Sequence, residues 1–200
     1  MTKILLIRHA TTDSVGKRLS GRTPGVFLNE EGVAQAQQLA QRLANFPVDA
    51  LYSSPLERTL QTADFVAQAQ QLQTIPMEDF LEINFGEWTN CTFEELSGDQ
   101  QFQRFNSFRS VTRIPGGELM LEAQARVIAG LQKLCAQHPH GTVAVVSHSD
   151  LIKAAVAYYA GVHLDMFQRL EISPASVSII EVYEETARIL LINDTGELKP

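Results

Sequence analysis

The sequence predicts an α/β protein, a three-layer α/β/α sandwich around a mostly parallel central sheet. Short apolar runs of strand length alternate with longer stretches whose apolar residues repeat at helical spacing, which is typical of that fold class. The runs at 4–7 and 142–146 are unbroken, as expected of strands buried on both faces. With 200 residues, 44% of them hydrophobic, the composition supports one core and excludes a disordered chain. We expect one domain spanning residues 1–200.

The expected elements run in this order: strand 4–7, polar loop 8–28, helix 30–43, strand 50–52, helix 54–66, strand 74–77, irregular segment 79–117, helix 118–136, strand 142–146, helix 150–160, and a hairpin of strands 177–182 and 187–192. Asn29 is a suitable N-cap for the first helix. Ser54 and Glu57 form a capping-box pattern for the second, and Pro55 stands where its missing N–H has no cost. The hairpin closes the fold.

The segment 79–117 interrupts the alternation and is predicted to be a lid or insertion. Phe102, Phe105 and Phe108 recur at every third position within it. Two interpretations remain open. The phenyl rings form a helix seam that packs on the core, or they belong to a lid that turns three arginines toward a substrate: Arg104, Arg109 and Arg113.

The charge and cysteine content limit the kinds of binding partner and the cellular compartment that the sequence allows. The chain has 16 Lys and Arg against 23 Asp and Glu, a formal net charge of −7, which argues against non-specific nucleic-acid binding. The run 4–7 is too short to span a membrane, and no signal peptide is expected. Cys91 and Cys135 have no metal-ligand or redox spacing. We interpret them as reduced thiols of a cytoplasmic protein. The sequence does not indicate an oligomeric state.

Cationic and imidazole side chains follow three of the predicted strands. Arg8 and His9 follow the first, Arg58 follows the second at a helix start, and His148 follows the strand at 142–146. Because ligands of open α/β sheets bind beyond the carboxyl ends of the strands, these four side chains are expected to meet at one edge.

This combination suits a phosphate ester. Two guanidinium groups bind a tetrahedral dianion bidentately. A neutral imidazole is a nucleophile, and a second, protonated imidazole stabilises charge on the transferring oxygens. The helix that begins near Ser149 adds backbone N–H donors. A leaving alkoxide also needs a proton, and three acidic residues remain open as its donor: Asp79, Glu82 and Glu87. A metal site of His9 and His148 with Asp13 and Asp150 lacks compact ligand spacing and leaves both arginines without a purpose.

Several motifs occur together in a fixed order. They are Arg8-His9-Ala10-Thr11-Thr12, Leu28-Asn29-Glu30-Glu31-Gly32 with Gln35-Ala36, Ser53-Ser54-Pro55-Leu56-Glu57-Arg58-Thr59, Glu82 to Trp88, Pro115-Gly116-Gly117-Glu118 and Ser147-His148. This series resembles the histidine phosphatase superfamily, whose fold is the phosphoglycerate mutase-like sandwich. The matching stretch runs from Ile4 to Lys153, about three-quarters of the chain.

The resemblance implies roles for individual residues. His9 would be the nucleophile that carries the phosphoryl group, and Glu82 the proton donor and later the base. Arg8, Arg58 and His148 would form the phosphate pocket, with further contacts from Thr12 and Ser149. No metal or cofactor is implied.

Two positions depart from the family pattern. Ala10 stands where the family has Gly, which adds a methyl group near the pocket. Val15 stands where the family often has a phosphate-contacting Asn. Arg22, from the same loop, is a candidate to compensate.

The expected function is a metal-independent phosphatase that hydrolyses small phosphate monoesters through a phosphohistidine. Two alternatives stay open. A phosphoglycerate-type mutase would return the phosphoryl group to its substrate, but only 79–117 is available to shield the site from water. A non-catalytic phosphate-ester binding protein would need only the cations. In each case the expected partner is a small phosphorylated metabolite.

Overall fold

The computed structural model describes residues 1–196 and is built on one six-stranded sheet with the strand order β3-β2-β4-β1-β5-β6. The strands are β1 (Thr2–Arg8), β2 (Ala50–Ser53), β3 (Thr74–Pro76), β4 (Thr142–Ser147), β5 (Val177–Val182) and β6 (Ala187–Asp194). β1, β2, β3 and β4 run parallel to one another, and β5 and β6 form an antiparallel hairpin beside β1. The predicted fold class is confirmed.

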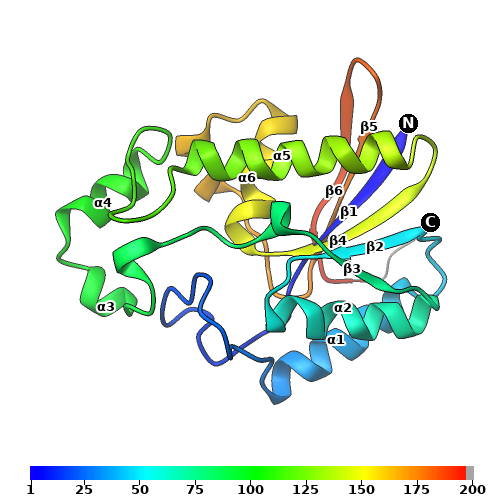
Figure 1. Ribbon diagram of the computed structural model, residues 1–200, viewed down its shortest axis with the longest axis horizontal. Coiled ribbons are helices and arrows are strands. Elements are labelled where there is room, and N and C mark those ends of the chain that lie inside the picture. Colours follow the sequence, from blue (N-terminus) through cyan, green and yellow to red (C-terminus); the bar gives the residue numbers. More distant parts are fainter. Residues whose placement is uncertain (197–200) are drawn as a thin grey trace.

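Helices cover both faces of the sheet (Figure 1). The chain forms α1 (Glu30–Leu43), α2 (Glu57–Gln70), α3 (Phe93–Leu96), α4 (Gln100–Ser107), α5 (Met120–Gln137) and α6 (Ser149–Ala160), with short 3₁₀ turns η1 (Glu78–Phe80), η2 (Gly86–Trp88) and η3 (Leu164–Arg169). In Figure 1, α1 and α2 lie below the sheet, and α5 and α6 lie above it. Within residues 1–196, no helix is both long enough and apolar enough to cross a membrane.

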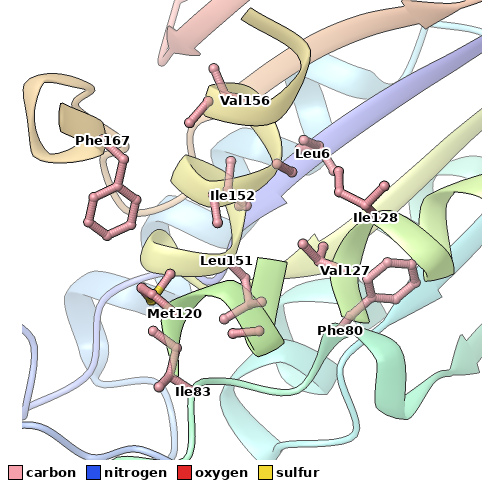
Figure 2. Close-up of a cluster of buried hydrophobic side chains, with 14 of the residues drawn as sticks. Leu6, Phe80, Ile83, Met120, Val127, Ile128, Leu151, Ile152, Val156 and Phe167 are labelled. Carbon is pink, nitrogen blue, oxygen red and sulfur yellow. The ribbon is translucent and has the colours of Figure 1, made fainter. Parts of the chain in front are cut away.

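The apolar run of β1 explains the two layers. Successive strand side chains point to opposite faces. Ile4 and Leu6 therefore join the cluster under α5 and α6, whereas Leu5 and Ile7 join the cluster against α1 and α2. Figure 2 shows the first cluster, in which Leu6 lies among apolar side chains of both covering helices. A strand between two such layers has no polar face, as its sequence indicates.

The two predicted helix caps have different outcomes. Asn29 caps α1 as predicted, because its side chain accepts a hydrogen bond from the Gly32 N–H at 2.9 Å. The capping box at Ser54 and Glu57 is wrong. α2 begins only at Glu57, and its N-cap residue makes no side-chain hydrogen bond. The Ser54 hydroxyl lies instead 2.9 Å from Nε2 of His148. Arg58 is consequently the second residue of α2.

The segment 79–117 contains η2, α3 and α4 and projects beyond the sheet edge where β1 and β4 end (Figure 1). Its phenylalanines divide between the two interpretations. Phe105 is buried against Trp88, and Phe102 packs on the same indole while lining a pocket. Phe108 is 56% exposed and belongs to neither a seam nor a pocket wall. The segment therefore packs on the body of the protein with one side and faces a pocket with the other.

Candidate active site

A pocket of about 390 Å³ opens at the carboxyl ends of β1 and β4. Arg8, His9, Arg58 and Glu82 all line it. His148 is fully buried beside them, and its ring centroid lies 5.3 Å from that of His9. The side chains that were expected to meet at one sheet edge are therefore adjacent.

Strand pairing brings the two imidazoles together. β1 and β4 are parallel neighbours, and their register places Arg8 opposite Ser147. The next residue of each strand is a histidine, and the His9 N–H donates to the Ser147 carbonyl at 3.0 Å. Arg58 arrives from the start of α2, on the far side of β4 from β1. Residues more than a hundred positions apart thus share one site because their strands end at one level.

The hydrogen bonds of His9 fix its tautomer. Nδ1 lies 2.8 Å from the Ala10 carbonyl oxygen, which can only accept, so Nδ1 carries the proton. Nε2 then has a free lone pair. Burial lowers the pKa of His9 well below its ordinary value, and the nearby charges of Arg58 and Arg8 lower it further. His9 is therefore neutral at physiological pH, with an unprotonated nitrogen.

The N–H groups of Arg8 and Arg58 find only some of their hydrogen-bond acceptors within the protein. Arg8 Nη1 donates to the Ile172 carbonyl at 2.6 Å, and Arg58 Nη2 donates to the Gly21 carbonyl at 2.7 Å. These two contacts hold the guanidinium planes in place. Arg8 Nε and Arg58 Nη1 are buried yet have no hydrogen-bond partner among residues 1–196. Unpaired buried N–H groups of cations are costly, and an anion in the pocket offers them acceptors.

His148 differs from the expectation of a protonated imidazole. Arg58 Nη2 lies 3.3 Å from its Nδ1, and because a guanidinium can only donate, Nδ1 is unprotonated. The proton is on Nε2, which donates to the Ser54 hydroxyl at 2.9 Å. Burial, followed by the charge of Arg58, lowers the pKa of His148 well below its ordinary value. In this structure both imidazoles are neutral.

Of the three candidate proton donors, Glu82 is the one that lines the pocket. Its Oε1 accepts a hydrogen bond from the Ile83 N–H at 2.9 Å, and its Oε2 lies 3.7 Å from Nδ1 of His148. Burial raises the pKa of Glu82 to about 7, and the charge of Asp150 adds to the rise. The two other candidates lie elsewhere: Glu87 is exposed, and Asp79 pairs with Lys133 at 2.9 Å.

Some of the remaining predicted site residues lie at the pocket and others do not. Thr12 and Ser149 line the pocket. Arg22 does not, and its expected place at the phosphate is wrong: Nε donates to the Glu82 carbonyl at 2.7 Å and Nη2 pairs with Glu118 at 3.0 Å. The methyl group of Ala10 packs into the core against α1 and α2 and leaves the pocket unchanged.

Sequence reasoning only partly anticipated the wall of the pocket that carries Arg109 and Asp150. Arg109 is buried there between the rings of Phe105 and Phe167, at 4.4 and 4.7 Å from their centroids. Its Nη1 pairs with Asp150 at 3.2 Å, and its Nη2 donates to Asn106 at 2.7 Å. Gln168 completes this wall and carried no sequence signal. Of the open lid arginines, only Arg109 reaches the pocket, because Arg104 is exposed and Arg113 pairs with Glu122.

The acidic and imidazole groups of the described part of the chain do not form a metal-binding cluster. Over residues 1–196, no group of three or more His, Cys, Asp or Glu side chains is placed to hold an ion. Asp13 does not line the pocket, and its carboxylate accepts a hydrogen bond from the Asn29 side chain outside it.

Comparisons with known proteins agree with this geometry. The family described as "Histidine phosphatase superfamily (branch 1)" matches residues 4–195. The chain is 34% identical over 202 residues to phosphoserine phosphatase 1 of Hydrogenobacter thermophilus, covering 99% of this chain and 95% of that protein. It is 36% identical to the bifunctional protein Rv2228c of Mycobacterium tuberculosis, with 98% of this chain matched to 55% of that longer protein. A crystal structure of an Entamoeba histolytica phosphoserine phosphatase mutant with phosphoserine superposes with a TM-score of 0.88 at 29% identity, covering 100% of both chains.

Proposed function

The chain belongs to branch 1 of the histidine phosphatase superfamily, and on that premise we propose that it hydrolyses small phosphate monoesters through a phosphohistidine on His9, without a metal ion. One observation carries the proposal. The unprotonated Nε2 of a neutral, buried imidazole lies in a pocket with two guanidinium groups, each of which has a buried N–H without a partner among the described residues.

In the first step, Nε2 of His9 attacks phosphorus and the bond from phosphorus to the ester oxygen breaks. The carboxyl group of Glu82 gives its proton to the departing alkoxide, which leaves as an alcohol. Arg8 and Arg58 hold the equatorial oxygens and stabilise their charge. Nδ1–H of His9 stays on the Ala10 carbonyl throughout, which keeps the ring oriented.

In the second step, the Glu82 carboxylate accepts a proton from water. The water oxygen bonds to phosphorus while the bond from phosphorus to Nε2 breaks, so inorganic phosphate leaves and His9 is again neutral. Glu82 ends protonated, as it began. A pKa of about 7 suits both duties, because neither the acid nor the base form is then scarce at neutral pH.

Phosphoserine is the substrate that we propose to test first. Two of the proteins compared above are phosphoserine phosphatases. In addition, one wall of the pocket pairs the guanidinium of Arg109 with the carboxylate of Asp150. The phosphate ester of serine keeps one free carboxylate and one ammonium group, which complement such a pair.

Labelling tests the proposal. The protein is incubated with ³²P-labelled phosphoserine in the presence of a chelator, quenched in alkali, and examined for protein-bound label that is lost in acid. We expect such label together with release of inorganic phosphate, and neither in His9→Ala. In a parallel incubation with ³²P-labelled 3-phosphoglycerate, label recovered in an isomeric phosphoglycerate instead of in inorganic phosphate would support a mutase. Binding without label or turnover would support a non-catalytic binder, and loss of activity with the chelator would overturn metal independence.

Three broader features belong to the same proposal. We place the protein in the cytoplasm, which is supported by Cys91 and Cys135 both being free thiols. We treat residues 1–200 as one domain. The segment 79–117 is taken as the lid, since it supplies one wall of the pocket through Phe102, Asn106 and Arg109, among others.

A further inference from the structure

The turn formed by Pro115, Gly116, Gly117 and Glu118 has no part in the steps above, yet it contacts the segment that carries Glu82. The carboxylate of Glu118 accepts from the Asn84 N–H at 2.8 Å. It also pairs with Arg22 at 3.0 Å and with Arg126 at 3.3 Å. One carboxylate therefore joins two guanidinium groups, from the loop before α1 and from α5.

Both guanidinium groups reach on to the backbone on either side of Glu82. Arg126 Nη1 donates to the Leu81 carbonyl at 2.8 Å. Arg22 Nε donates to the Glu82 carbonyl at 2.7 Å. Together with the Asn84 N–H on Glu118, three peptide groups within residues 81–84 are held by one charged cluster. We call Arg22, Glu118 and Arg126 the brace.

The backbone of the turn presses on the same segment. The Glu118 N–H donates to the Asn84 carbonyl at 3.0 Å, and the Glu87 N–H donates to the Pro115 carbonyl at 2.9 Å. The approach is too close for a side chain at Gly86, where a Cβ would lie 2.1 Å from the Pro115 oxygen. The turn and the Glu82 segment are therefore in direct contact with no room to slide.

We propose that Glu118 is a positioning residue for the general acid Glu82, an inference that rests on the proposed function. Glu118 does not line the pocket and cannot touch the substrate. Its effect is electrostatic: without its charge, Arg22 and Arg126 become two like charges that face each other and repel. The peptide groups that they hold then shift, and a catalytic group displaced by about 1 Å loses on the order of a hundredfold in rate.

The brace also couples the acid to the phosphate site. Arg22 directly follows Gly21, whose carbonyl holds Arg58 at 2.7 Å. A single stretch of the loop before α1 therefore contacts the phosphate arginine through Gly21 and the acid segment through Arg22. This arrangement fixes the distance between the group that holds phosphate and the group that protonates the leaving oxygen.

The test is Glu118→Gln, which preserves shape and removes the charge. Its readout is kcat/KM for two esters, because kcat/KM covers only the steps through departure of the leaving group. The leaving group of phosphoserine is the serine alkoxide, which needs a proton from the acid, whereas p-nitrophenyl phosphate releases p-nitrophenolate, which is stable without one. We expect kcat/KM for phosphoserine to fall roughly ten- to hundredfold and that for p-nitrophenyl phosphate to stay within about threefold. Arg22→Gln, at a half-exposed site where folding is less at risk, should give the same pattern.

Two controls isolate the effect. Glu122→Gln makes the same chemical change at the other carboxylate of this region, which is exposed and pairs with Arg113 without contacting residues 81–84. It should leave both esters unchanged. In a Glu82→Gln background, Glu118→Gln should cost nothing further on phosphoserine, since the group that it positions is already gone.

An equal loss on both esters, or an additional loss in the double variant, would overturn the role of Glu118 and indicate a general structural effect. That outcome is distinct from failure of the proposed function, in which the unmodified protein would form no phosphoenzyme and hydrolyse neither ester.

Discussion

Replacing Glu82 by Gln should stabilise the protein at neutral pH while it removes the proposed acid. Folding raises the pKa of this carboxyl from 4.5 to about 7, first because the group is buried and second because Asp150 lies near. Below pH 4.5 the carboxyl is protonated in both the folded and the unfolded state, so its burial carries no ionisation penalty. As the pH rises from 4.5 to 7, the unfolded chain ionises while the folded protein keeps the proton, so stability is lost.

The magnitude follows from the size of the pKa change. A rise of about 2.5 corresponds to about 3 kcal/mol at 1.36 kcal/mol per pKa unit. Gln does not ionise, so a protein with Gln at this position does not lose stability in this way as the pH rises. Glu82→Gln should therefore match the parent protein near pH 4.5 and exceed it by about 3 kcal/mol above pH 7, a rise of roughly 6–12 °C in Tm for a chain of this size.

Urea unfolding of both proteins between pH 4.5 and 8.5 measures this difference. The buffers must contain no phosphate, because an anion in the pocket would stabilise the folded state by binding. Glu87→Gln is the matched control, since it alters an exposed carboxyl of the same segment and should change stability little at any pH. If the stability difference between Glu82→Gln and the parent were the same at pH 5 and pH 8, the raised pKa would be refuted. The proposed acid–base role would then lose its physical basis.

Three further predictions concern other parts of the molecule. Arg58→Lys should lower kcat/KM by roughly 10²–10³ and weaken inhibition by inorganic phosphate, because an ammonium group cannot bind bidentately. Steady-state kinetics measures both quantities, and unchanged inhibition by phosphate would contradict the prediction. Asn29→Ala removes the cap of α1 and should lower the free energy of unfolding by about 1 kcal/mol, with kcat unaltered; urea unfolding beside the assay tests this. Gly86→Ala should lower the free energy of unfolding by about 1–3 kcal/mol, because Gly86 has φ +47° and its new Cβ would meet the Pro115 oxygen. Urea unfolding measures this, and an unchanged free energy of unfolding would show that the turn can move away from the new side chain.

The sequence could predict the meeting of His9 and His148 because it depends on short-range rules. Each histidine lies two residues after the end of an unbroken apolar run, and both runs became parallel neighbours whose ends lie at one level. Their proposed roles remain predictions, but their proximity required only that the two strands pair. The burial that lowers both imidazole pKa values follows from the same pairing.

The predictions that failed concern side chains whose partners come from distant segments. Ser54 and Glu57 satisfy a capping pattern locally, yet in the fold the Ser54 hydroxyl lies beside Nε2 of His148, and α2 starts later. Arg22 lies in the loop beside the phosphate motif, yet Glu118 and the Glu82 carbonyl hold it. In each case a partner roughly a hundred residues away determines the geometry, and spacing along the chain carries no information about it.

The charges of the pocket explain why Glu82 has to be buried. Apart from Arg18 on the exposed rim, the lining contains three guanidinium groups and, besides Glu82, the carboxylate of Asp150. With Glu82 protonated, the pocket has two positive charges, which match a phosphate dianion. An ionised Glu82 would cancel one of them and repel the substrate. A bound dianion in turn raises the pKa of Glu82 further. In the proposed mechanism, the charge that fills the pocket therefore also holds the proton that goes to the leaving oxygen.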